Sequence, residues 1–334
     1  MQMIKVPRLM SGDTIGIIAP SSPLPNIFER RFKQGVAGIE ALGFRTVISD
    51  HALSRDGHTA GTIAERVADL HEMFRRPDIK AVICAIGGFN ANQLLPFVDF
   101  ELIKSHPKII MGYSDISVLT AAIHAKTDMV TFSGPMVMTQ FGEIPKILSY
   151  TERSFRSVLM DAAAPITFAP SPDWTDEFLD WGKSLDTRAR ATKPGTWEAI
   201  KEGSAKGKLI GGHLGSLDAL VGTEYFPSFQ NRIFFWEETD SSIDEMDRYL
   251  WHVRELGLFE KIEGMLVGRM FDVSGASDEA VKETVLRATE GYHFPIIMNM
   301  DFGHTDPMLT LPLGIEASFD TRKKELQLLE SAVF

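Results

Sequence analysis

The sequence contains a single cysteine, Cys84, among its 334 residues. One cysteine excludes an intrachain disulfide, a four-cysteine zinc site and an iron–sulfur cluster. Long apolar runs are also missing, since none approaches the ~18–20 residues that span a bilayer. The opening residues 1–20 lack the basic, apolar and small-residue regions of a signal peptide. These absences predict a cytoplasmic protein that has no membrane partner.

Positive charge is scarce as well, with 34 lysine and arginine residues against 45 aspartate and glutamate residues. Residues 1–160 carry 17 basic and 15 acidic side chains, whereas residues 161–334 carry 17 and 30. Affinity for nucleic acid comes mainly from neutralising phosphates, so this balance predicts no nucleic-acid partner. Neither a G-x-G-x-x-G nor a Walker pattern occurs, so dinucleotide and triphosphate binding lack their usual support.

The first half of the sequence alternates short apolar runs with helical patterns. The runs at 14–19 and 81–86 are continuous and apolar, and helical spacing at 28–42 and 63–75 lies between them. This alternation is typical of a parallel sheet that is covered on both faces. Residues 1–165 are therefore predicted to form an open α/β domain with a parallel sheet of the flavodoxin or Rossmann type.

The second half has a different pattern. Residues 166–205 are predicted to be a linker and an insertion that contains three tryptophans. The tryptophans argue against disorder, so the insertion is expected to be a lid over a functional site. From there on β-like runs dominate, and the capping-box form Ser242-Ile-Asp-Glu245 predicts the start of a helix. Residues 206–334 are predicted to be a second α/β domain, rich in β-structure.

A candidate nucleophile lies in the segment Gly112-Tyr113-Ser114-Asp115, between an apolar strand pattern and a helix-like stretch. A strand, a sharp turn and a helix form a nucleophile elbow, in which the helix N-terminus favours a developing oxyanion. The segment departs from G-x-S-x-G, and serine and aspartate are also common helix caps. Helix capping is therefore the alternative role for Ser114 and Asp115.

Two further segments carry groups that suit such a serine. Gly87 and Gly88 follow a buried strand, where N–H groups can bind an oxyanion, or where they form a plain turn. Glu237 and Glu238 close a strongly apolar strand. A carboxylate at a strand end can orient a histidine, although solvated charge pairs are common there.

The ninth histidine of the chain, His304, lies in a loop-like segment between Asp301 and Asp306. Its unperturbed pKa of ~6.5 suits a general base. The two aspartates leave metal-dependent hydrolysis open, although no H-E-x-x-H or H-x-H pair supports it. A serine, a strand-end glutamate and a loop histidine together favour a triad, because triads are recognised by roles rather than order.

These segments resemble the LD-carboxypeptidase and microcin C immunity protein family of serine peptidases, over nearly the whole chain. The matching segments are GDTIGIIAPSS at 12–22, GGFN at 87–90, LLP at 94–96, GYSD at 112–115, GGHL at 211–214, FWEE at 235–238 and GH at 303–304.

The resemblance implies a cofactor-free amide hydrolase, without a metal, whose catalytic site lies at the interface of the two domains. Ser114 would be the nucleophile, His304 the general base and Glu237 the group that orients the imidazole. Glu238 is the neighbouring alternative. The resemblance further implies a homodimer and an oxyanion hole. The N–H groups expected to form that hole belong to Gly87, Gly88 and Asp115.

The family has two branches. One removes the terminal D-amino acid from peptidoglycan peptides, and the other hydrolyses the amide that joins an aminoacyl group to a non-hydrolysable adenylate. The segment from Phe89 to Asn92 and the tryptophan-bearing insertion resemble the second branch. We therefore expect an aminoacyl-nucleotide or aminoacyl-sulfamoyl-adenosine substrate. Hydrolysis of murein tetrapeptides is the alternative within the family, and a non-catalytic two-domain binding protein is the alternative outside it.

The resemblance also suggests substrate-binding residues, which are Asn90, Phe178, Trp181 and His213. A tryptophan can stack on a nucleobase, an interaction worth roughly 1–3 kcal/mol per base in nucleic-acid complexes. We expect this role for Trp181 alone, and expect Trp174 and Trp197 to pack the insertion onto the body. His213 stands where the immunity branch often has asparagine.

Overall fold

The apolar runs of the first half form the first of two large sheets. The computed structural model describes residues 3–334. The strands of this sheet are β1 (Thr14–Ile18), β2 (Arg45–Ile48), β3 (Ile79–Cys84), β4 (Ile109–Met111), β5 (Thr131–Ser133) and β16 (Leu311–Leu313). They lie in the order β16-β5-β4-β3-β1-β2, with β1 to β5 parallel and β16 antiparallel to β5. The order β2-β1-β3-β4-β5 is that of flavodoxin, so the predicted fold class is confirmed for this domain.

Helices follow the strands of this sheet, as a doubly wound domain requires. They are α1 (Leu24–Ile27), α2 (Glu29–Ala41), α3 (Ile63–Arg75), α4 (Phe100–Ser105), α5 (Ile116–Thr127) and α6 (Ser149–Leu159), with a 3₁₀ helix η1 (Ala91–Phe97) and a π-helix η2 (Val137–Phe141). The helix predicted at 63–75 is confirmed to the residue, because Thr62 and Glu65 form a capping box at its start.

The second sheet carries the β-rich pattern of the second half. Its strands are β6 (Ile166–Phe168), β9 (Glu198–Lys201), β10 (Ser204–His213), β11 (Arg232–Glu237), β13 (Ile262–Gly268), β15 (Ile296–Met300), β17 (Glu316–Asp320) and β18 (Glu325–Leu328). The order is β6-β18-β17-β10-β11-β13-β15-β9, and β10, β11, β13 and β15 are parallel. Three helices accompany it, which are α7 (Leu214–Asp218), α8 (Ile243–Glu255) and α9 (Asp278–Ala288). The capping box predicted at Ser242 and Glu245 opens α8.

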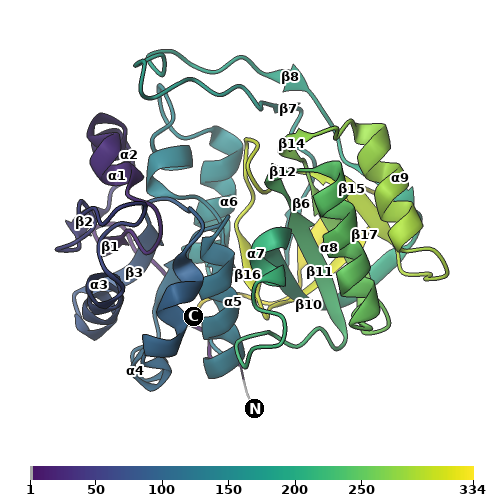
Figure 1. Ribbon diagram of the computed structural model, residues 1–334, viewed down its shortest axis with the longest axis horizontal. Coiled ribbons are helices and arrows are strands. Elements are labelled where there is room, and N and C mark those ends of the chain that lie inside the picture. Colours follow the sequence, from purple (N-terminus) through teal and green to yellow (C-terminus); the bar gives the residue numbers. More distant parts are fainter. Residues whose placement is uncertain (1–2) are drawn as a thin grey trace.

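Two short pairs of strands complete the fold. They are β12 (Thr239–Ser242) with β14 (Phe271–Ser274), and β7 (Asp173–Trp174) with β8 (Lys193–Pro194). The pair β7–β8 belongs to the tryptophan-bearing insertion, which arches in teal across the top of both halves (Figure 1).

The two sheets exchange strands, so the units at 1–165, 166–205 and 206–334 are less separate than the sequence suggested. The predicted linker and insertion contribute β6 and β9 to the second sheet, and β16 returns to the edge of the first. Strand pairing joins segments that are far apart in the chain, and local patterns carry no signal of it.

The strand β3 that leads into Gly87 is buried, and Cys84 at its end is fully buried, as expected of a core residue. Burial raises the pKa of its thiol. No helix within residues 3–334 is both long and apolar enough to cross a bilayer.

Candidate active site

Ser114 lies in the tight turn between β4 and α5. Its φ of +62° lies in the left-handed region, a strained conformation for serine that clusters at functional sites. Within residues 3–334 neither Ser114 nor Asp115 caps α5 with its side chain. The carboxylate of Asp115 instead accepts hydrogen bonds from Ser21 Oγ and from the Ala91 N–H, the latter at 2.8 Å. Asp115 thereby ties the loops after β1 and β3 to the serine turn, and helix capping does not explain this segment.

Gly87 lies directly against the serine. A Cβ atom at Gly87 would come within 2.8 Å of Ser114 Cβ and 2.9 Å of Ser114 Oγ, so only glycine fits this close approach. The backbone N–H groups of Gly87, Gly88 and Asp115 donate to no acceptor within residues 3–334. Unused N–H groups beside a strained serine are the arrangement that an oxyanion hole requires.

Glu237 ends β11 and orients His304. The imidazole Nδ1 lies 2.7 Å from Glu237 Oε2, and only 2% of Glu237 is exposed. Burial alone would raise the pKa of Glu237, but the charge and hydrogen bond of His304 outweigh it and lower that pKa. The left-handed Gly303, with φ +97°, brings the loop backbone against the Glu237 side chain, where a Cβ atom would clash.

Glu238, the alternative partner, points to a different histidine. Its Oε2 accepts a hydrogen bond of 2.9 Å from the Gly215 N–H. Its Oε1 lies 2.9 Å from His213 Nε2, close enough for an ion pair but off the line of an N–H···O hydrogen bond. Of the two adjacent carboxylates, Glu237 is therefore the one that contacts His304.

Ser114 and His304 face the same cavity, which measures about 930 Å³. Within residues 3–334 no hydrogen bond joins the two side chains, and such bonds are often long in empty active sites. The ring of Tyr113 packs edge-on against His304, with 4.9 Å between ring centroids. Gly87, Gly88 and the insertion also line this cavity, which collects residues from both halves of the chain.

The four predicted substrate-binding residues fall into two groups. Phe178 and Trp181 line the cavity, and Phe178 is 61% exposed. Asn90 and His213 are not part of the cavity wall. The Asn90 carbonyl accepts a hydrogen bond from Arg66, and His213 is held against Glu238. A direct substrate contact by Asn90 or His213 stays a prediction.

The tryptophans of the insertion differ in their surroundings. Trp181 is half-buried, with the Arg31 guanidinium 5.0 Å from its ring centroid. Trp174 lies between the cations of Lys193 and Arg269. Trp197 is fully buried and donates a 2.7 Å hydrogen bond to Asp301. Trp174 and Trp197 pack the insertion onto the body, as expected.

The aspartates near His304 are engaged by cations. Asp301 pairs with Arg269 at 2.5 Å, and Asp306 pairs with Arg190 at 2.5 Å. No group of three or more His, Cys, Asp or Glu side chains in residues 3–334 is placed to hold a metal ion. The arrangement of these side chains therefore gives the metal hypothesis no support.

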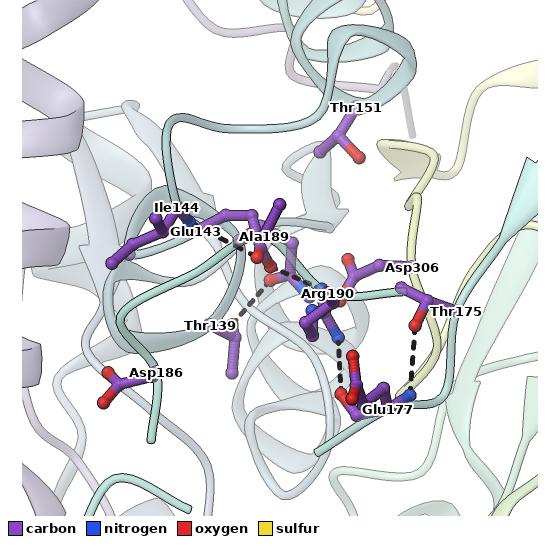
Figure 2. Close-up of polar contacts among 12 residues, drawn as sticks. Thr139, Glu143, Ile144, Thr151, Thr175, Glu177, Asp186, Ala189, Arg190 and Asp306 are labelled. Carbon is purple, nitrogen blue, oxygen red and sulfur yellow. Dashed lines mark hydrogen bonds and ion pairs between the residues drawn. The ribbon is translucent and has the colours of Figure 1, made fainter. Parts of the chain in front are cut away.

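An ionic network around Arg190 was not anticipated from the sequence. Arg190 joins Glu143 of the first domain to Asp306 of the His304 loop (Figure 2). Nothing in the local pattern distinguishes Arg190 from the other charged residues of the insertion. Its partners lie 47 and 116 residues away, so only the fold brings the three together.

Comparison with known proteins agrees with this geometry. Residues 15–134 match the LD-carboxypeptidase N-terminal domain, and residues 206–319 match the LD-carboxypeptidase C-terminal domain. The chain is 34% identical over 326 residues to the microcin C7 self-immunity protein MccF of Escherichia coli, covering 96% of this chain and 94% of MccF. It is 38% identical over 309 residues to the putative carboxypeptidase YocD of Bacillus subtilis, covering 92% and 93%.

Solved structures of MccF have the same fold. The complex with aspartyl sulfamoyl adenosine matches with a TM-score of 0.94 at 32% identity, over 99% of this chain and 100% of that one. The complex with glutamyl sulfamoyl guanosine has a TM-score of 0.94 at 31% identity, over 99% of both chains. Because both halves of the chain match the family and relatives align along nearly its full length, the protein belongs to the LD-carboxypeptidase family and is a serine peptidase of that family.

Proposed function

We propose that this protein hydrolyses the amide bond of microcin C-like aminoacyl-nucleotide or aminoacyl-sulfamoyl-adenosine compounds, and so detoxifies them. The observation that carries the proposal is that His304, held by the buried Glu237, faces the same cavity as the strained Ser114. The cavity volume of about 930 Å³ lies within the usual range for small-molecule sites. Phe178 and Trp181 supply aromatic surface on its wall, which suits a nucleobase.

The proposed chemistry proceeds through an acyl-enzyme. His304 takes the proton of Ser114 Oγ as the oxygen attacks the carbonyl carbon, and Glu237 stabilises the imidazolium that forms. The oxyanion receives hydrogen bonds from unused backbone N–H groups, each worth about 3 kcal/mol. His304 then protonates the leaving nitrogen, and water releases the acyl group by the reverse sequence. The N–H donors are those of Gly87, Gly88 and Asp115.

The choice of substrate rests on the MccF relatives, whose structures hold aspartyl sulfamoyl adenosine and glutamyl sulfamoyl guanosine. Hydrolysis of murein tetrapeptides is the second candidate, which the 30% identity over 327 residues to a probable murein peptide carboxypeptidase of Bacillus subtilis favours. Both candidates break an amide bond by the same chemistry, so they differ only in what fills the cavity.

The test compares two reactions, the release of aspartate from aspartyl-sulfamoyl adenosine and the release of D-alanine from a murein tetrapeptide. Chromatography measures both products. We expect the nucleoside compound to be cleaved faster, and Ser114→Ala to lose about 10⁴-fold or more of the turnover. Ser105→Ala, at an exposed serine in the last turn of α4, is the matched control with unchanged turnover. Cleavage of the tetrapeptide alone would contradict the proposed substrate, and full turnover by Ser114→Ala would contradict the serine mechanism.

The homodimer and the cytoplasmic location also stay predictions. Light scattering of the purified chain and fractionation of cells that express it would check them.

A further inference from the structure

The guanidinium of Arg190 holds two carboxylates of the cavity wall that come from different parts of the chain. One nitrogen, Nη2, lies 2.5 Å from Glu143 Oε2 and 2.5 Å from Asp306 Oδ2. Only 16% of the Arg190 side chain is exposed, against 5% for Glu143 and 7% for Asp306. Figure 2 shows Arg190 between these two carboxylates. The two carboxylates would repel each other without the cation, because both are largely shielded from water.

The three residues come from three parts of the chain. Glu143 follows η2 in the first domain, Arg190 belongs to the insertion, and Asp306 lies two residues after His304. The backbone of the insertion also pairs with this loop. The Thr175 N–H donates to the Asp306 carbonyl at 2.6 Å, and the Asp306 N–H donates to the Thr175 carbonyl at 3.0 Å.

A second ion pair of the insertion differs in one respect. Arg188 also lines the cavity, but it pairs with Glu177, which lies in the same insertion. The Arg188–Glu177 pair stabilises the insertion internally and reaches neither domain. Among residues 3–334, Arg190 alone pairs with a carboxylate of the first domain and with one of the His304 loop at the same time.

We propose that Arg190 is a positioning residue, which makes the placement of His304 depend on closure of the insertion over the cavity. The guanidinium neutralises Asp306 and holds it toward Glu143, and so fixes the loop that carries the imidazole. The kinetic part of this inference rests on the proposed function. Burial alone would lower the pKa of Arg190, but the charges of Asp306 and Glu143 outweigh burial and raise it, so the cation persists at every working pH.

The test compares Arg190→Gln with the wild type in two measurements, and Arg188→Gln is the matched control for the first of them. The first is amide hydrogen exchange of the segments 173–197 and 301–308. The second is kcat and KM for aspartyl-sulfamoyl adenosine. We expect Arg190→Gln to speed exchange in both segments and to lower kcat roughly 10- to 100-fold, since a displacement of ~1 Å at the reacting groups costs about that much. KM should change less than kcat. Arg188→Gln, at a residue that also lines the cavity, is compared in the exchange measurement alone, and it should speed exchange in 173–197 but not in 301–308.

Two further variants separate positioning from a loss of folding. Arg190→Lys should recover most of kcat, because a single nitrogen contacts both carboxylates and an ammonium can take its place. The double variant Arg190→Gln with Asp306→Asn removes the charge at 306 and its repulsion of Glu143, so it should be more stable than Arg190→Gln. Its kcat should be no lower than that of either single variant, because residues acting through one contact are not additive.

Unchanged exchange at 301–308 in Arg190→Gln would overturn the proposal, as would a kcat within about twofold of the wild type. Additive losses in the double variant would also overturn it. If the wild type cleaves no aminoacyl-sulfamoyl nucleoside, the proposed function fails, and the exchange comparison by itself decides the role of Arg190.

Discussion

Glu237 and Glu238 are neighbours in the chain, yet each holds a different histidine. Successive side chains of an extended strand point to opposite faces. At the end of β11, Glu237 therefore contacts His304, and Glu238 contacts His213 on the other side. Two glutamate–histidine pairs therefore lie side by side, with 5.8 Å between the two imidazole centroids. The local sequence pattern left either glutamate as the candidate partner of His304, and the resemblance to the family favoured Glu237.

Substitution of each glutamate tests which pair works in catalysis. Glu237→Gln should lower kcat by about 10³- to 10⁴-fold, because the amide no longer stabilises the imidazolium. Glu238→Gln is the matched control and should cost less than about tenfold, since its contacts reach His213 and Gly215 instead. Steady-state kinetics of both variants checks this, and equal losses would contradict the assignment.

His213 is expected to make stability depend on pH. Burial would lower its pKa, but the contact with Glu238 and the charges of Glu237, Glu238 and Asp115 outweigh burial and raise it to about 9. A histidine whose pKa is raised on folding stabilises the protein fully below its unfolded pKa of about 6.5. That stabilisation is lost as the pH rises through about 9.

Denaturation curves at about pH 6 and about pH 10 measure this effect. The extra free energy of unfolding of the wild type over His213→Gln should fall by about 1–3 kcal/mol between the two values. His58→Gln, at an exposed histidine of the first domain, is the control, and its difference from the wild type should not change. If the extra free energy of unfolding of the wild type over His213→Gln grew with pH instead, the prediction would be contradicted.

At the scale of elements, the buried carboxylate of Asp301 binds both ends of the insertion. Asp301, at the end of β15, accepts hydrogen bonds from the Ser171 N–H at 2.8 Å and from Trp197 Nε1 at 2.7 Å. It also pairs with Arg269 and is itself fully buried. Between these ends, Asp186 pairs with Arg30 and Arg31 of α2. The insertion is thus held to both domains by ion pairs and hydrogen bonds, in addition to the packing of the buried Trp197.

Asp301→Asn should destabilise the protein strongly. Breaking a buried ion pair costs about 3–5 kcal/mol, because Arg269 is left with an uncompensated charge. Calorimetry should show a Tm lower by roughly 6–20 °C, at about 2–4 °C per kcal/mol. Proteolysis within 173–197 should also become faster. The control Arg188→Gln breaks a solvent-exposed pair worth less than about 1 kcal/mol, so its Tm should stay near the wild type.

At the scale of the whole molecule, the strands of each sheet come from separate parts of the chain. The strand β16, from the second half, covers the edge of β5, while β6 follows the first domain and pairs with β18. Ser114 lies in the first domain, and Glu237 and His304 lie in the second. A hydrogen bond also joins the two halves, since the His213 N–H donates to Ser117 Oγ of α5 at 2.9 Å.

This exchange of strands predicts that the halves do not fold independently. A fragment of residues 1–165 lacks β16 and exposes the apolar edge of β5, which favours aggregation. Size-exclusion chromatography and denaturation curves of the fragment should show aggregates without a cooperative transition. A monomeric fragment with cooperative unfolding would contradict this prediction.

The acidic character of the chain is also seen at the cavity wall, where carboxylates pair with the arginines. The excess of acid in residues 161–334 argues against an anionic ligand. The three arginines on the cavity wall, Arg31, Arg188 and Arg190, are each paired with carboxylates. Among the described residues, these pairs leave no arginine charge on the cavity wall without a carboxylate partner.

Local signals in the sequence were sufficient for most elements and for the catalytic candidates. Helical spacing predicted α3, a capping box predicted the start of α8, and the strand–turn–helix pattern singled out Ser114. These features depend on residues within one or two turns of each other, so composition and spacing record them. The resemblance to the family added the choice of Glu237 as the partner of His304.

Only the tertiary structure decided how distant segments meet. The pairing of β16 with β5, the position of Asn90 and His213 outside the cavity wall, and the bridge of Arg190 to Glu143 and Asp306 involve long separations in sequence. The local pattern around an arginine or a strand edge is compatible with many partners. The packing of the whole molecule therefore decides which partner it contacts. The single cysteine and the short apolar runs thus determined what the protein lacks, while the fold determined which of its charges meet at the serine.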